Sequence, residues 1–163
     1  MNEIHPTARI SPQADLETSV RGSRLVIGAR SMVDSFVKIK FAGGSGDIVI
    51  GEGCYLNSGC VLYSGNGISI GDGVLIAANC TLAPATHAFA DRDTPIASQG
   101  FSPSKGGIEI GDDVWIGVNC ALLDGARVGK GAVIAAGSVI RGEVPEYAVF
   151  GGSPATFIKW RGV

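Results

Sequence analysis

The feature that most constrains the fold of this chain is an aliphatic residue that returns every six positions. The longest such run is Ile110, Ile116, Leu122, Val128, Ile134 and Ile140. Shorter runs occur at Ile27, Val33 and Ile39, at Ile50, Leu56 and Leu62, and at Ile70, Ile76 and Leu82. A helix repeats about every 3.6 residues and a strand alternates every two. A period of six therefore predicts a short strand followed by a turn, repeated many times.

Small residues share the inner side of these strands with the aliphatic ones. The position two before each aliphatic residue points to the same side of a strand. The four cysteines, Cys54, Cys60, Cys80 and Cys120, each stand four residues after an aliphatic position, in this small inner place. We interpret them as small core residues rather than redox groups. With no CxxC spacing and only two histidines, the sequence predicts no metal site.

Three hexads make one triangular coil of 18 residues, which is the arrangement of an all-β parallel β-helix. Ile110 is then expected to stack on Val128, and Ile116 on Ile134. Leu122 is expected to stack on Ile140 in the same way. Successive coils would lie about 4.8 Å apart, with the aliphatic columns filling the centre.

Breaks in the period predict loops and a tail. From Leu82 to Ile110 the chain takes 28 residues where one hexad needs six, so 22 extra residues form an external loop over about 84–107. A loop of this length in a tight solenoid indicates function. We expect the β-helix to occupy residues 1–142 and a tail to occupy 143–163. Within the tail, Ser153-Pro154 predicts an N-cap and a short helix, Ala155 to Arg161, that covers the open end.

Composition excludes several classes of protein. The net charge of −2, from 13 basic and 15 acidic residues, gives no basic excess for nucleic acid or a membrane surface. No apolar run reaches the roughly 18 residues of a membrane span, and the first residues lack the pattern of a signal peptide. We therefore expect a cytoplasmic protein whose cysteines are thiols.

Several segments are similar to one enzyme family. Ile108–Gly117, Gly131–Ser138, Gly151–Ala155 and the short Ala85-Thr86-His87 resemble the hexapeptide-repeat acyltransferases. The chain looks most like the small O-acetyltransferases of galactosides, maltose and surface polysaccharides. This resemblance implies a left-handed β-helix, acetyl-CoA as co-substrate and a sugar hydroxyl as acceptor. It also implies a homotrimer with active sites between neighbouring subunits.

His87 is the candidate catalytic residue. It stands where the repeat breaks into its longest loop, whereas the other histidine, His5, lies in the N-terminal arm. An alcohol that attacks a thioester needs a base, and imidazole is the usual one. The resemblance implies that His87 is this base, in a direct transfer within a ternary complex. It also implies that a backbone N–H near Val118 stabilises the oxyanion.

Asn57 and Asp93 are candidates for contact with the acceptor. In the galactoside-type enzymes an asparagine one coil before the histidine lies beside the acceptor, and Tyr55-Leu56-Asn57 aligns with that stretch. The alternative for Asn57 is a polar turn residue. Asp93 belongs to a charged loop with an aromatic residue, Phe101, which suits a polyol, although a solvated loop would look the same. Those enzymes carry an acidic residue where this chain has Ser64-Gly65.

A second set of residues is expected to bind CoA. The candidates are Trp115, Gly117, Ala135, Ala136, Arg141 and Lys159. Small residues expose the backbone to the narrow pantetheine arm, and the resemblance assigns that role to the segment at Ala135. Trp115 should point outward, because its neighbours Val114 and Ile116 point inward. The basic residues would meet the CoA phosphates, but Thr156 stands where the family usually has a basic residue.

Two other functions remain open. The chain could be an antibiotic acetyltransferase of the same fold, or a non-catalytic β-helix that serves as an assembly subunit. The histidine in the long loop and the intact segment Ala135–Ser138 favour an enzyme, because a scaffold needs neither.

Overall fold

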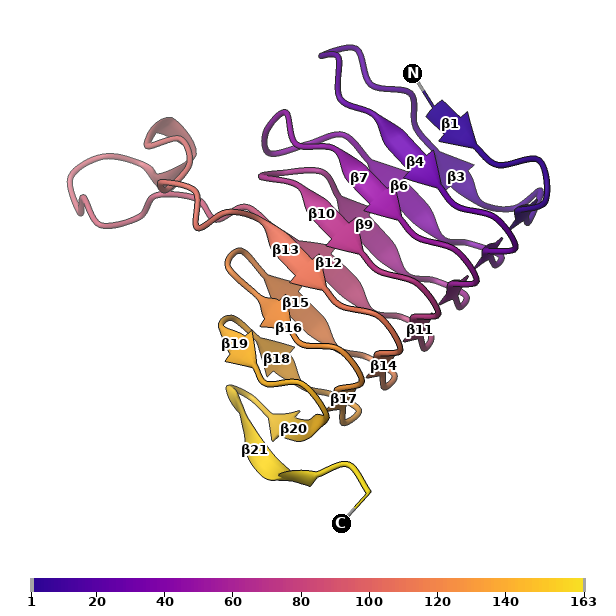
Figure 1. Ribbon diagram of the computed structural model, residues 1–163. Helices are drawn as coiled ribbons and strands as arrows, with labels where there is room; N and C mark the ends of the chain where they lie inside the picture. Colours follow the sequence, from indigo (N-terminus) through magenta and orange to yellow (C-terminus); the bar gives the residue numbers. More distant parts are fainter. Residues whose placement is uncertain (1, 163) are drawn as a thin grey trace.

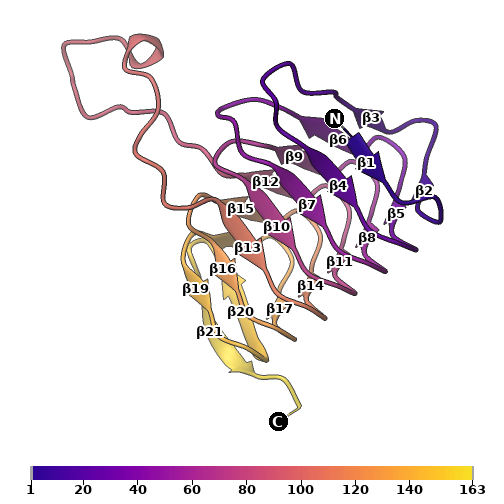
Figure 2. The same cartoon turned by 45° about the horizontal axis from the view of Figure 1, so that its top comes forward.

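The computed structural model describes residues 2–162, which form a parallel β-helix (Figure 1). This confirms the all-β architecture that the six-residue period predicts. Successive coils contribute one short strand to each of three sheets, and from β1 to β20 these strands pair in parallel with their equivalents in the neighbouring coils. The coils follow one another in sequence order from the N-terminal to the C-terminal end (Figure 2).

The three sheets form the three sides of the solenoid. Sheet A consists of β1 (Asn2–Ile4), β4 (Leu25–Ile27), β7 (Ile48–Ile50), β10 (Ile68–Ile70), β13 (Ile108–Ile110), β16 (Arg127–Val128) and β19 (Glu143–Val144). Sheet B consists of β2 (Arg9–Ile10), β5 (Met32–Val33), β8 (Tyr55–Leu56), β11 (Leu75–Ile76), β14 (Trp115–Ile116), β17 (Val133–Ile134), β20 (Ala148–Gly152) and β21 (Ala155–Trp160). Sheet C consists of β3 (Asp15–Leu16), β6 (Lys38–Lys40), β9 (Val61–Tyr63), β12 (Thr81–Ala83), β15 (Ala121–Leu123) and β18 (Val139–Ile140).

The aliphatic columns have the predicted register. The paired residues are Ile110 with Val128, Ile116 with Ile134, and Leu122 with Ile140. All six side chains are at most 4% exposed. Full burial of one such side chain contributes about 1.5–3 kcal/mol, so these columns are the main source of stability.

Residues with a left-handed backbone conformation form the turns between strands. The residue just before most of the small inner positions has a positive φ, for example +60° at Asn79 and +58° at Asn119. Gly53, Gly73 and Gly131 occupy the equivalent place in other hexads. Glycine and asparagine adopt this conformation most readily, so the turn geometry accounts for much of the high glycine content.

The cysteines lie in the core, as predicted, and are free thiols. Each thiol donates to a backbone carbonyl of the following coil. The Sγ–O distances are 3.0 Å for Cys54 to Gly71, 3.1 Å for Cys60 to Ala77, 3.1 Å for Cys80 to Gly117 and 3.2 Å for Cys120 to Ala135. Burial raises the pKa of Cys54, and the hydrogen bond with Cys80 followed by burial raises that of Cys120. These two side chains therefore stay protonated near neutral pH.

The predicted C-terminal helix is wrong. Ala155–Trp160 is strand β21, which runs antiparallel to β20 at the end of sheet B. Ser153-Pro154 lies in the turn between the two strands rather than at a helix start. The segment contains Thr156, Phe157 and Ile158, residue types that favour strands, and β20 offers an unpaired edge. Pairing with that edge satisfies backbone groups that a helix would leave exposed.

Residues 84–107 leave the solenoid between β12 and β13 and project from it as an arm (Figures 1 and 2). The arm contains one short 3-10 turn, η1 (Ile96–Ser98). Within residues 2–162 no helix has the length and apolar character needed to cross a membrane.

Candidate functional site

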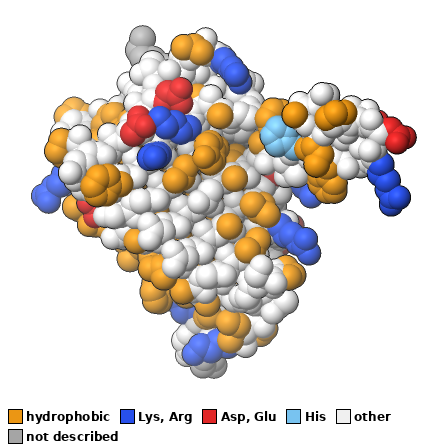
Figure 3. Space-filling model, turned by 180° about the vertical axis from the view of Figure 1, so that it is seen from behind, with side chains coloured by type: hydrophobic (Ala, Val, Ile, Leu, Met, Phe, Trp, Pro, Cys, Tyr) orange, Lys and Arg blue, Asp and Glu red, His pale blue; other side chains and the backbone are white. Residues whose placement is uncertain are grey.

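His87 lies in the arm close to the solenoid. The two sides of the arm form a short antiparallel ribbon, in which Ala88 N–H donates to Gly100 O at 3.0 Å and Ser102 N–H donates to Thr86 O at 2.8 Å. His87 pairs with Phe101 across this ribbon. Figure 3 shows apolar side chains around the pale blue histidine of the arm. The sequence places His87 here because the coil ends at Ala83, four residues earlier.

The imidazole of His87 is exposed and stacks on an aromatic ring. Its centroid lies 4.6 Å from that of Phe101, with 28° between the two planes. Within residues 2–162 neither ring nitrogen of His87 has a hydrogen-bond partner. Both nitrogens are thus open to a substrate, and imidazole is the side chain that most readily exchanges a proton near neutral pH.

Two side chains of the solenoid fix the returning side of the arm. The buried carboxylate of Asp124 accepts hydrogen bonds from the N–H groups of Lys105 and Gly107, at 2.8 and 2.9 Å. The guanidinium of Arg127 donates to the carbonyls of Lys105 and Gly107, at 3.2 and 2.9 Å. Asp124 also accepts from Asn66 Nδ2 at 3.1 Å. These contacts set the position at which the arm rejoins the solenoid.

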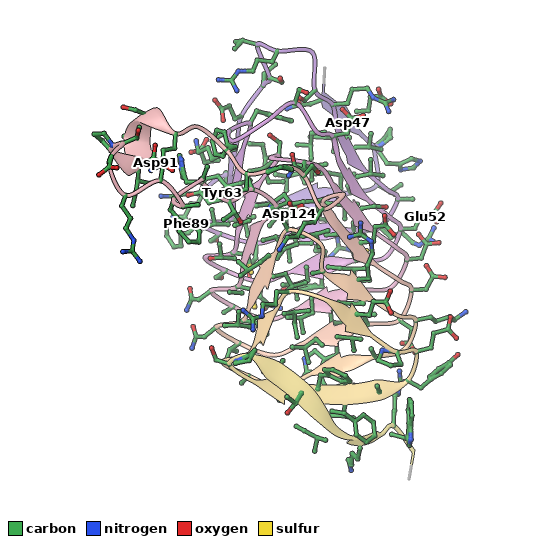
Figure 4. The ribbon with its side chains drawn as sticks, turned by 90° about the vertical axis from the view of Figure 1, so that its left-hand side faces the viewer. Asp47, Glu52, Tyr63, Phe89, Asp91 and Asp124 are labelled. Atoms are coloured by element: carbon green, nitrogen blue, oxygen red, sulfur yellow. The ribbon has the colours of Figure 1, made fainter. Side chains whose placement is uncertain are left out.

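The outer part of the arm is a polar turn. Asp91 accepts from the Asp93 N–H at 2.9 Å and from the Thr94 hydroxyl at 2.7 Å. The Thr94 hydrogen bond, followed by that of Asp93, lowers the pKa of Asp91. Figure 4 shows Asp91 on the outer arm and Asp124 on the solenoid. Asp93, a candidate for acceptor contact, is exposed in this outer turn.

Five of the candidate residues come together where β14 and β17 end, at the corner between sheets B and C. They are Trp115, Gly117, Val118, Ala135 and Ala136. Trp115 is 54% exposed and points outward, as its position in the repeat predicts. A Cβ at Gly117 would lie 2.6 Å from Ala136 N, so only glycine fits between these coils. The result is a narrow strip of small residues with backbone atoms near the surface, beside a large aromatic ring.

The backbone of Val118 has a free donor in this strip. Its carbonyl accepts from Gly137 N–H at 2.8 Å, but its own N–H has no acceptor within residues 2–162. The side chain of Val118 is 43% exposed. An unpaired N–H at an accessible position can donate to a bound anion or a developing oxyanion.

The remaining candidates lie elsewhere in a single copy of the chain. Asn57 Nδ2 donates to Ile76 O at 3.1 Å, which fits the alternative of a polar turn residue. Arg141 follows β18, and Lys159 lies on β21 opposite Val149. His87 follows the end of sheet C strand β12, whereas Val118 precedes the start of sheet C strand β15. One copy therefore does not bring the candidate base and the candidate oxyanion donor together.

Sequence reasoning missed three residues that shape the site. Asp124 and Arg127 do not interrupt the six-residue repeat, so nothing in the repeat marks them as functional. Their partners, Lys105 and Gly107, are about twenty residues away in the sequence. Phe101 was expected only as an aromatic of the loop, because a pairing with His87 across the arm has no local signal.

Two family models match the repeats of this chain. The bacterial transferase hexapeptide (six repeats) matches residues 107–142, and the hexapeptide repeat of succinyl-transferase matches residues 47–84. The chain is a hexapeptide-repeat protein. The matched ranges cover coils on both sides of the arm, and the strip at the corner of sheets B and C lies wholly within the first range.

Relatives of this hexapeptide-repeat protein include curated enzymes with a short match. The 2,3,4,5-tetrahydropyridine-2,6-dicarboxylate N-acetyltransferase of Staphylococcus aureus strain JH9 is 53% identical over 38 residues. That stretch is 23% of this chain and only 16% of the relative. The similarity is thus confined to a short part of each chain.

Solved structures with the same fold extend over the whole chain. AntD, an N-acyltransferase from Bacillus cereus in complex with dTDP and 3-hydroxybutyryl-CoA, has a TM-score of 0.81 at 21% identity. The match covers 98% of this chain and 82% of AntD. A hexapeptide-repeat acetyltransferase of Vibrio cholerae has a TM-score of 0.57 at 22% identity, covering 98% of this chain and 72% of that one. These matches show a shared fold.

Proposed function

We propose that this hexapeptide-repeat protein transfers an acetyl group from acetyl-CoA to a hydroxyl of a sugar, with His87 as the general base. The observation that carries the proposal is the placement of His87. It is exposed beside the solenoid, with both ring nitrogens open, in a chain whose repeats match transferase families. Solved proteins of this fold include acyltransferases in complex with coenzyme A or acyl-CoA.

The chemistry assigns one step to each group. His87 takes the proton of the acceptor hydroxyl as its oxygen attacks the thioester carbonyl. The carbonyl oxygen becomes an oxyanion, and the free N–H of Val118 donates to it. When the tetrahedral intermediate collapses, the C–S bond breaks and His87 returns its proton to the CoA thiolate. The buried cysteines need form no acyl-enzyme, because their thiols are bonded inside the core.

The strip at the corner of sheets B and C is suited to acetyl-CoA. Small side chains at Gly117, Ala135 and Ala136 let the pantetheine amides reach backbone groups, and Trp115 offers an exposed ring beside them. Arg141 and Lys159 are exposed toward the C-terminal end, where they would pair with the phosphates. Thr156 supplies no charge there.

The proposed site needs two copies of the chain. His87 and Val118 lie at opposite ends of sheet C, so the base of one copy must meet the oxyanion donor of another. The homotrimer implied by the family resemblance would provide this arrangement. The outer side chains also differ between sheets, which supports association through sheets B and C. Leu75 and Trp115 on sheet B and Tyr63 on sheet C are exposed and apolar or aromatic, whereas sheet A presents Glu109 and Glu143.

A second candidate function is transfer to an amine. The curated S. aureus relative and AntD are both N-acyltransferases by name, which favours this alternative. A neutral amine is a stronger nucleophile than an alcohol, but it also loses a proton during acyl transfer. Asn57 and Asp93 would contact the acceptor in either case. The two candidates therefore differ in the acceptor and share the donor and the base.

Calorimetry and an acetyl-transfer assay together test the proposal. We expect acetyl-CoA to bind both the wild type and His87→Ala with micromolar affinity. Assays with sugar alcohols and with amino sugars, including antibiotic amino sugars, then identify the acceptor. His87→Ala should lower kcat by about 10²–10⁴, the usual loss for a general base, with an unchanged melting temperature.

Three outcomes would change the conclusion. If acetyl-CoA binds neither protein, the solenoid acts as a scaffold and the search turns to protein partners. Activity of His87→Ala above about a tenth of the wild type would remove His87 from the role of base. Transfer only to amino sugars would replace the hydroxyl acceptor with an amine.

A further inference from the structure

The imidazole of His87 is held in an unusual way for a general base. A catalytic histidine is commonly oriented by a hydrogen bond from one ring nitrogen to a carboxylate or a carbonyl. Within residues 2–162 His87 has no such bond, and its one ring contact is the stack on Phe101 at 4.6 Å. This distance is within the range of favourable offset aromatic stacking.

We propose that Phe101 is the positioning residue of His87, fixing the plane of the imidazole so that a ring nitrogen faces the acceptor. The proposal rests on the function proposed above. Phe101 does not touch the reacting atoms in this role. It restricts the side-chain rotation of His87 while leaving both nitrogens free, one of them for the acceptor hydroxyl.

The contact between the two rings is fixed by backbone on both sides. His87 and Phe101 are directly paired, and the Ala88–Gly100 and Ser102–Thr86 hydrogen bonds lie on either side of the pair. Ser102 Oγ also donates to the carbonyl of His87 at 3.4 Å. The backbones of the two residues therefore stay side by side as long as the ribbon is closed.

Phe101 also links the arm to the solenoid. A Cβ at Gly43 would lie 3.8 Å from Cε1 of Phe101 and 3.1 Å from Cβ of Ala85. Gly43 belongs to the loop between β6 and β7, a part of the solenoid wall. One edge of the Phe101 ring thus lies near a loop of the solenoid, while the ring stacks on His87.

The other phenylalanine of the arm provides a matched control. Phe89 lies two residues after His87 and is 67% exposed, against 52% for Phe101. It makes no aromatic ring contact within residues 2–162. Removal of the Phe89 ring should therefore leave the orientation of His87 unchanged. Replacing Phe89 or Phe101 by leucine removes the same aromatic ring from the arm.

The first test is an NMR measurement that does not depend on activity. The chain has only His5 and His87, so two sets of imidazole proton signals are expected, and His87→Gln assigns them. A stacked ring shifts the signals of its neighbour through its ring current. Phe101→Leu should move the His87 signals, whereas Phe89→Leu should leave them in place. His5 serves as the internal reference in each spectrum.

The second test separates positioning from acceptor binding. Misplacement by about 1 Å can cost as much as 10²-fold in rate, so Phe101→Leu should lower kcat by about tenfold with both KM values nearly unchanged. Phe101→Tyr, which keeps the ring, should restore both kcat and the His87 signals. Phe89→Leu should behave as the wild type, and the melting temperature of each variant shows whether it is folded.

Two results would overturn the positioning role. One is a set of His87 signals that stays in place in Phe101→Leu. The other is a raised KM for the acceptor with kcat preserved, which would assign Phe101 to substrate binding. Failure of the proposed function looks different, because then His87→Ala keeps its activity or acetyl-CoA does not bind, whatever the NMR spectra show.

Discussion

The solenoid and the arm differ in what holds them in place. In the solenoid, aliphatic residues of successive coils are buried against one another, and the same contact recurs from Ile27 to Ile140. In the arm, Phe89, Ile96 and Phe101 are all more than half exposed. The arm is fixed instead by polar contacts at its base and in its outer turn. The comparison shows that stability is collective in the solenoid, whereas the geometry of the arm depends on a few bonds.

The largest expected effect is in the solenoid core. Ile116→Lys places a charge in the central column, where the wild-type side chain is fully buried and the core cluster of residues 2–162 contains no acidic side chain. Breaking a core contact and burying an unpaired charge costs about 4–5 kcal/mol or more, so the variant should not fold. Circular dichroism during thermal and urea unfolding measures whether Ile116→Lys folds.

A matched substitution on the outer face is the control. Ser69 lies on β10 with an exposed side chain, so Ser69→Lys adds the same charge to a strand without entering the core. Its unfolding midpoint should stay near that of the wild type. A cooperative transition of Ile116→Lys at the same midpoint would show that the assigned inward face is wrong.

A smaller effect is expected at the base of the arm. Asp124→Ala leaves the N–H groups of Lys105 and Gly107 without acceptors, which costs about 1–3 kcal/mol. Amide exchange at these two residues should accelerate far more than in the coils, and kcat should fall as the arm shifts. Asp112→Ala, which removes one exposed bond to the Asp72 N–H, is the control. Faster exchange throughout the coils of Asp124→Ala would show that Asp124 supports the core itself.

The smallest effect is expected in the outer turn. Asp91→Ala removes the acceptor of the Asp93 N–H and the Thr94 hydroxyl, so amide protection should fall in this turn alone. The pKa of Asp91 is lowered in the folded chain, so its bonds are present above the ordinary aspartate value of about 3.9. They are lost as the pH falls through the lowered value. Protection of Asp93 in the wild type should therefore drop in acid while Asp91→Ala shows no such step. A change in the global unfolding midpoint would contradict the separation of the two regions.

The sequence predicted the solenoid in detail because the repeat leaves few alternatives. A one-residue error in phase would turn every aliphatic residue outward, so the period fixes the inward face and hence the pairing of Ile116 with Ile134. The C-terminal segment has no repeat to fix it. Ser153-Pro154 is compatible with both a helix start and a turn. It forms a turn because the segment after it pairs with the free edge of β20.

The candidate site was less predictable for a related reason. The sequence located His87 by the break in the period, and the exposed Trp115 by its phase. The stack of His87 on Phe101 depends on how the arm closes on itself. The contacts of Asp124 depend on how far the arm returns along the solenoid. Both contacts involve the arm, which has no periodicity, so no local pattern encodes them.

Strand β21 has a consequence for how such a molecule can associate. A solenoid of stacked coils is in principle an open polymer, because each end presents three parallel strands on which another coil could pair. In sheet B that continuation is interrupted, since β21 runs antiparallel to β20 and occupies its edge. Within residues 2–162 the last strands of the other two sheets, β18 and β19, keep an unpaired outer edge. Head-to-tail growth into a fibre therefore lacks the sheet B template at the C-terminal end.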